Sequence, residues 1–161
     1  LEFRRVLFRS QRTLMLPHVN RLGLMRVRPD GTDYISARYL YNDVEEFIHV
    51  PLVQWSWLSN IKAFLKIDDS GNSAIVVGFV PDEDFEVYLA GYDNFDSRNI
   101  VYFDMQGRIL QNRKGMGGGG FILYNVPDDT HEVVVLGAKS QKMHSKVIPV
   151  DPNSLSVLTF R

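Results

Sequence analysis

The stretch that decides the fold class is residues 117–137, GGGGFILYNVPDDTHEVVVLG. A run of glycines opens it, and a polar turn at residues 127–130 separates two apolar runs. The apolar members of the two runs are Phe121, Leu123, Val126, Val133 and Val135. Because Pro127 presets a turn and strand-forming residues lie on both sides of it, the stretch predicts a β-hairpin.

The chain after residue 73 continues as short strand-like runs with turn signals between them. Besides the hairpin, these runs are residues 74–80, 85–89, 99–104, 108–111, 145–150 and 155–160. About seven or eight short strands thus fit into fewer than about ninety residues, a spacing typical of β-sandwiches. We therefore expect a mainly β fold in which residues 73–161 form a seven-stranded antiparallel β-sandwich.

A second hairpin is expected ahead of the sandwich. Its runs, residues 22–28 and 33–41, flank Pro29, Asp30 and Gly31, which together are a strong turn signal. Apolar residues alternate along the second run, so one face of this hairpin is less polar than the other.

One amphipathic helix is expected within residues 51–67. Apolar side chains recur there at three- and four-residue spacing, and they are Trp57, Leu58, Ile61, Phe64 and Leu65. Trp57 is expected to pack the helix onto the sheet, whereas Trp55 points elsewhere and is the better candidate for an exposed aromatic. Two arrangements fit residues 11–72: they pack on the sandwich as one unit, or they are the end of a truncated upstream domain.

Residues 1–10, LEFRRVLFRS, resemble the translated end of a DNA sequencing adapter. A basic amphipathic start or a transit peptide is the alternative. On the adapter interpretation the chain is a fragment of environmental sequence, its true N-terminus is missing, and a signal peptide would lie upstream.

Composition excludes several classes of function. The 161 residues are 45% hydrophobic and 23% charged, which is ordinary for a globular protein. The formal net charge is −1, so no basic excess supports binding to nucleic acid. Without cysteine there can be no disulfide, thiolate metal site or thiol catalysis. No apolar run reaches the roughly 20 residues of a membrane helix, so we expect no membrane span in this fragment.

Residues 73–161 resemble the carboxypeptidase regulatory-like domain, a transthyretin-like, Ig-like sandwich. The signature residues are Gly120, Phe121, Leu123, Asn125, Val126, Pro127, Thr130, Val133 and Val135. An early strand with an internal glycine, Gly78, also fits the pattern. The family usually carries glycine where this chain has Asp129, a position expected to be left-handed, which aspartate tolerates better than most residues.

The resemblance implies a non-catalytic structural or interaction module of a larger exported bacterial protein, periplasmic or at the cell surface. Its expected partners are other domains of the same protein or a protein partner. Two alternatives stay open. One is an accessory domain of a peptidase that lies outside this fragment. The other is a carbohydrate-binding module, with Trp55, Tyr92 and Phe95 as stacking rings and acidic turns that hold calcium.

The chemistry of an active site is not expected, and no catalytic, cofactor or metal residues are assigned. The four histidines lack metal-binding spacing, and His131 is expected to be exposed at the hairpin turn. Residues 68–72 resemble a calcium loop only in part, and we interpret them as a polar linker. The glycine run at residues 115–120 is interpreted as a flexible loop or bulge. The acidic turn of Asp82, Glu83, Asp84 and Glu86 is interpreted as a solvated tip.

Overall fold

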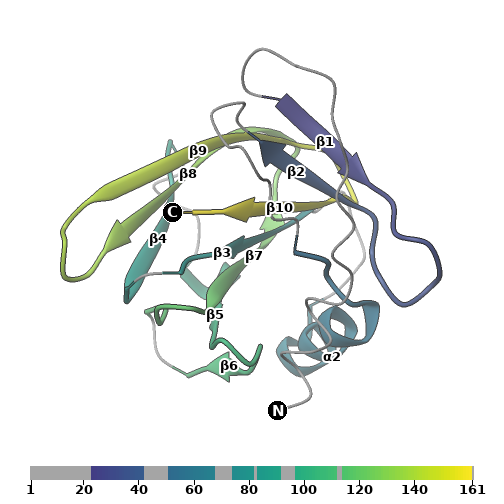
Figure 1. Ribbon diagram of the computed structural model, residues 1–161, viewed down its shortest axis with the longest axis horizontal. Helices are drawn as coiled ribbons and strands as arrows, with labels where there is room; N and C mark the ends of the chain where they lie inside the picture. Colours follow the sequence, from purple (N-terminus) through teal and green to yellow (C-terminus); the bar gives the residue numbers. More distant parts are fainter. Residues whose placement is uncertain are drawn as a thin grey trace.

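The computed structural model describes residues 23–41, 51–67, 74–81, 83–91, 97–111 and 114–160. The protein is mainly β, with two sheets and, within these ranges, one α-helix, α2 (Trp55–Leu65) (Figure 1). A 3₁₀ turn, η1, spans Ser97–Asn99. The described strands are β1 (Gly23–Val27), β2 (Ala37–Tyr41), β3 (Ala74–Phe79), β4 (Phe85–Leu89), β5 (Ile100–Phe103), β6 (Ile109–Leu110), β7 (Gly120–Val126), β8 (Asp129–Gly137), β9 (Met143–Val150) and β10 (Leu155–Thr159).

The two sheets differ in size, and the described strands do not close into a barrel. The larger sheet has seven strands in the order β1-β2-β10-β3-β7-β5-β6, and the smaller has three in the order β4-β8-β9. Strand β10 pairs in parallel with both β2 and β3, while the other pairings are antiparallel.

Alternate side chains of the large sheet enter two separate cores. On one face, Val76, Phe121 and Leu158 pack against residues of the small sheet such as Phe85 and Val133, and we call this the intersheet core. The members on the other face, with those of α2, are Ile75, Val77, Val101, Phe103, Ile122, Val157, Trp57, Leu58 and Ile61, and we call this the helix-side core. Burial on both faces explains why β3 and β7 are almost continuously apolar.

The expected helix and the expected hairpin within residues 22–41 are confirmed, as α2 and as β1–β2. Helix α2 buries Trp57, Leu58 and Ile61, and it ends with Lys66 in a left-handed conformation. Phe64 was expected on the buried stripe, but it is 72% exposed. Leu65 in the same last turn is half-buried against the helix-side core, so Phe64 lies at the edge of the apolar stripe and not beyond the end of the core.

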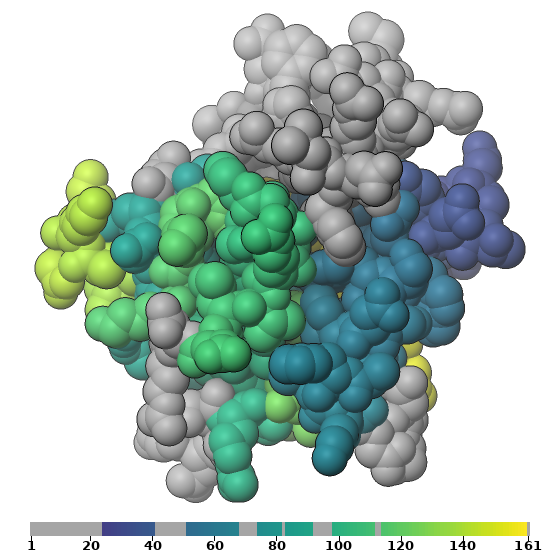
Figure 2. All heavy atoms as spheres, turned by 90° about the horizontal axis from the view of Figure 1, so that it is seen from below, coloured from purple at the N-terminus to yellow at the C-terminus, as the bar shows by residue number. Residues whose placement is uncertain are grey.

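Two side-chain hydrogen bonds attach helix α2 and the residues before it to the large sheet, one beside β6 and one at β2. The Trp57 indole Nε1–H donates a buried hydrogen bond of 2.9 Å to the Gly107 carbonyl oxygen, beside β6. Figure 2 shows the surface of the helix side by side with that of the β5–β6 region. At β2, the Tyr39 hydroxyl donates to the Pro51 carbonyl oxygen at 2.5 Å.

The described part of residues 11–72 packs on the large sheet and does not form a separate unit. Strand β1 pairs with β2, β2 pairs with β10, and α2 covers the helix-side core. The expectation of an all-antiparallel seven-stranded sandwich is therefore wrong in its details. Residues 74–160 carry eight described strands, β3 to β10, and the hairpin ahead of them meets the sheet through the parallel strand β10. The sequence signals that indicate strands carry no information on this distant pairing.

The expected hairpin at residues 117–137 is also wrong. Strand β7 pairs with β3 and β5 in the large sheet, whereas β8 pairs with β4 and β9 in the small sheet. The turn therefore carries the chain from one sheet to the other across the intersheet core. Its backbone includes Asn125 with φ 57° and the carbonyl oxygen of Pro127, to which buried His131 Nε2 donates at 2.8 Å.

Asn125 produces a β-bulge that explains the signature around it. Ala74 pairs with Val126 but Val76 pairs with Leu123, so β7 holds one extra residue at this point. The left-handed Asn125 supplies that residue and returns Val126 to the same core as Leu123. Asp129, where a left-handed conformation was expected, has no positive φ and begins β8.

Most signature residues lie in the interior. Gly120, Phe121, Leu123, Val126, Val133 and Val135 are buried, whereas Asn125, Pro127 and Thr130 are exposed. His131 is 1% exposed, which contradicts the expectation of an exposed histidine. His131 shares the inward face of β8 with Val133, so its ring fills space in the interior.

The glycine run is closely packed in the part that the structure describes, not a flexible loop. A Cβ on Gly120 would overlap the Gly78 carbonyl oxygen, and one on Gly115 would overlap the Phe85 ring. The backbone of Gly115 also exchanges hydrogen bonds with Phe85, at 2.8 and 3.0 Å. Glycine is required at Gly115 and Gly120 because a neighbouring ring or strand approaches the backbone too closely for any side chain.

Candidate binding groove

A groove of about 420 Å³ lies where α2, the β1–β2 hairpin and the turn between β9 and β10 meet. Its volume falls within the range of small-molecule sites, roughly 300–1,000 Å³. The side chains that decide its chemistry are Arg26, Arg38, Trp55, Lys62, Tyr124, Asn125, Asp151 and Asn153.

Trp55 stands on the wall of the groove and is 54% exposed, as the sequence led us to expect. Two backbone hydrogen bonds hold this end of α2 against the hairpin loop. The Trp55 N–H donates to the Asp33 carbonyl oxygen, and the Ile35 N–H donates to the Val53 carbonyl oxygen, both at 2.9 Å. The indole therefore projects from a fixed backbone beside a hollow that a ligand can enter.

The groove carries charge of both signs. Arg38 forms an ion pair with Asp151, and Arg26 is the cross-strand neighbour of Arg38. The hydrogen bond from Arg38 lowers the pKa of Asp151, and the charges of Arg38 and Arg26 lower it further. Lys62 lines the same groove from α2. Three cationic residues and one carboxylate thus line the groove among the described residues.

The rim of the groove is held in unusual backbone conformations. Asn125 and Asn153 have φ of 57° and 55°, in the left-handed region that residues other than glycine rarely occupy. The turn at Asn153 is fixed because the Ser154 hydroxyl donates to the Asp151 carbonyl oxygen at 2.6 Å. The Tyr124 hydroxyl donates to the Arg98 carbonyl oxygen. Such conformations gather at ligand sites more often than elsewhere.

Of the three expected stacking rings, the structure places only Trp55 in a groove. Tyr92 and Phe95 lie outside the described residues, as do the partial calcium loop at 68–72 and Asp82. Within the described ranges, no group of three or more metal-ligating residues occurs. The charged lining residues could not be predicted from the sequence because they lie far apart in the chain. Trp55 was the one lining residue that the sequence indicated.

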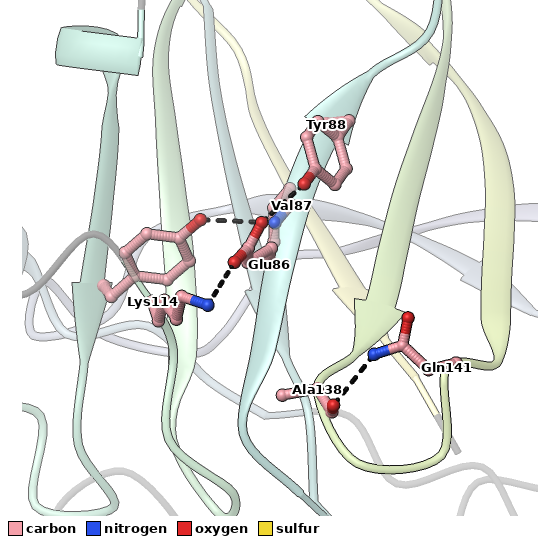
Figure 3. A network of polar contacts seen from close by, with 7 residues as sticks. Glu86, Val87, Tyr88, Lys114, Ala138 and Gln141 are labelled. Carbon is pink, nitrogen blue, oxygen red and sulfur yellow. Dashed lines mark hydrogen bonds and ion pairs between the residues drawn. The ribbon is translucent and has the colours of Figure 1, made fainter.

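The acidic turn is built into the structure and is not merely a solvated tip. The Glu83 carboxylate accepts hydrogen bonds from the Lys139 and Ser140 backbone N–H groups, at 2.8 and 3.0 Å. Hydrogen bonds with Ser140, foremost from its side chain, and with Lys139 lower the pKa of Glu83. Glu86 pairs with Lys114 and accepts from the Tyr88 hydroxyl (Figure 3). The Lys114 interaction is the main cause of a lowered pKa at Glu86.

The outer face of the small sheet is a second surface of interest. Its exposed apolar side chains are Tyr88, Met143 and Val147, and Val134 and Leu136 lie half-buried between them. Cross-strand register places Tyr88 beside Val134 and Leu136 beside Met143. These five residues, which we call the outer patch, are bordered by the carboxylates of Glu86 and Glu132.

Comparisons with known proteins give no assignment. No family model matches the chain, and searches of the curated proteins and of the solved structures found no match either. Among the helices that the structure describes, none is long and apolar enough to cross a membrane.

Proposed function

We propose that the chain is a non-catalytic binding module of a larger exported bacterial protein, and that it holds a saccharide in the Trp55 groove. The observation that carries this proposal is the half-exposed Trp55 on the wall of a groove rich in hydrogen-bonding groups. A flat indole offers apolar area to the face of a sugar ring. The nearby guanidinium, amide and carboxylate groups can bond its hydroxyls.

The test compares two exposed aromatic residues on the same helix. Soluble polysaccharides in a native gel should slow the wild-type chain, and Trp55→Ala should remove the retardation. Phe64→Ala is the matched control, because Phe64 is exposed on α2 but does not line the groove. If no polysaccharide slows the wild-type chain, or if Trp55→Ala is retarded as strongly as the wild type, the proposal fails.

We also propose that residues 73–161 form a β-sandwich of the carboxypeptidase regulatory-like family. The support is that its signature residues pack together. The Phe121 ring lies against the backbone of Gly78, the internal glycine of the early strand, and Leu123, Val126, Val133 and Val135 share one core with it. An experimental structure with a different strand order in this region would remove this proposal.

A second candidate function is contact with a protein partner through the outer patch. Exposed apolar side chains of one sheet face mark interaction surfaces, and the acidic border favours a partner with a basic rim. An amphipathic peptide of leucine and lysine is a direct probe, with a leucine–glutamate peptide as control. Val147→Lys should abolish binding of the first peptide. Equal binding of both peptides, or none, would contradict this function.

A further inference from the structure

We propose that the Trp55 groove selects acidic saccharides, whose carboxylate or sulfate groups bind at Arg26. This inference rests on the proposed saccharide site and adds the class of sugar. The formal net charge of the chain is −1, yet Arg26 and Arg38 both line the groove, where Asp151 is the single described carboxylate. The lining is therefore a positive region on a slightly acidic protein, and such a region attracts anions.

The position of Arg26 opposite Arg38 also favours an anion in this groove. The two residues are directly opposite in the β1–β2 register, and like charges in that position repel each other. Asp151 forms its ion pair with Arg38, and Arg26 acts on the same carboxylate only through space. The single negative charge of Asp151 offsets the positive charge of only one of the two guanidinium groups. A second anion supplied by a ligand would offset the other.

The helix wall of the groove is arranged to hold a sugar chain. Trp55 and Lys62 are seven residues apart, so they lie on the same side of α2 and about 10 Å apart along its axis. A ring stacked on Trp55 would place the next sugar of an oligosaccharide toward Lys62. A guanidinium group binds carboxylate and sulfate through two parallel hydrogen bonds, which suits Arg26 to anions carried on a ring.

The experiment uses polysaccharides matched in backbone and different in charge. Native gels contain polygalacturonate or its highly methyl-esterified form for the carboxylate arm, and dextran sulfate or dextran for the sulfate arm. The wild-type chain should bind at least one anionic polymer about tenfold more tightly than its neutral counterpart, as expected for the loss of a charged hydrogen bond. The arm that shows this preference identifies the anion.

Two variants separate the groove from general charge attraction. Arg26→Gln should remove the preference for the anionic polymer, while Arg108→Gln, an exposed arginine outside the groove, should keep it. Trp55→Ala should weaken binding of both polymers. Neutral binding without anionic preference would overturn this inference and leave the saccharide site in place. Equal losses in Arg26→Gln and Arg108→Gln would also overturn it, and no binding at all would overturn both proposals.

Discussion

Gly78 shows how one residue allows two strands of the large sheet to pack closely. It lies in β3, where the Phe121 ring of β7 rests directly against its Cα, and a Cβ there would overlap that ring. Phe121 is itself fully buried in the intersheet core, where its ring also lies close to the rings of Phe85 and Phe160. The internal glycine of this strand is therefore a packing requirement and not a break in the strand.

Gly78→Ala should lower the free energy of unfolding by about 1–3 kcal/mol, the usual cost of overpacking a core. Urea denaturation of the purified chain measures this change. Adding Phe121→Leu to Gly78→Ala should recover part of the loss, because the smaller side chain leaves room for the Cβ. A Gly78→Ala variant as stable as the wild type would show that the ring can move.

Glu83 is a residue whose charge stabilises a turn. Its pKa is lowered in the folded protein, mainly by hydrogen bonds with Ser140, so its charged form is favoured by folding. The stabilisation is fully present above the unfolded pKa of about 4.3 and is lost as the pH falls through the lower folded pKa. Glu83→Gln should therefore be less stable than the wild type at pH 7.

That difference between Glu83→Gln and wild type should shrink once the pH drops below about 4, where the unfolded carboxyl is protonated. Urea denaturation at a series of pH values provides the measurement. Asp128→Asn is a suitable control, because Asp128 is an exposed acid outside this turn. A gap between Glu83→Gln and wild type that stays constant from pH 7 to pH 3 would contradict the assigned role.

At the scale of elements, local signals found the strands but not their partners. The β1–β2 hairpin, the strand-like runs of β5 and β6, and helix α2 were predicted because their signals are turn residues and apolar spacing, which act within a few residues. The pairing of β8 with β9 and the crossing from β7 to β8 were not. A proline turn suits a return within one sheet and a crossing to another equally well, and only packing decides between them.

The bulge in β7 gives a prediction at this scale. Asn125→Ala should destabilise the protein by about 1–2 kcal/mol, since alanine resists the left-handed conformation that the bulge needs. Asn125→Gly should remain close to wild type, because glycine adopts that conformation freely. Thermal unfolding of both variants is the measurement. Equal destabilisation by alanine and glycine would indicate that the asparagine side chain matters instead of the backbone.

At the scale of the whole molecule, the candidate site is a product of tertiary structure. The groove takes Arg26 and Arg38 from the hairpin, Trp55 and Lys62 from α2, and Asp151 from a turn more than eighty residues further along. Only Trp55 could be selected from the sequence, because an aromatic residue off a helical stripe is conspicuous by itself. The charged residues look like ordinary surface positions until the fold brings them together.

Cleavage of the chain tests whether the hairpin and helix belong to the same body as the sheets. With a specific protease site inserted between Ser70 and Gly71, the two fragments should elute together on size exclusion after cleavage. The expected reason is that β2 pairs with β10 and that α2 buries Trp57, Leu58 and Ile61 against the large sheet. Separation of the fragments in native buffer would contradict this, and separation in urea is the positive control.

The parallel position of β10 also governs the order in which the protein can assemble. Strands β2 and β3 are not hydrogen-bonded to each other, and β10 lies between them. Because β10 is the last of the described strands to be synthesised, the early hairpin has no place in the sheet until the ribosome has made nearly all the others. Strands β1 and β2 must wait for β10, a delay that leaves their edges open to chaperones or to neighbouring nascent chains.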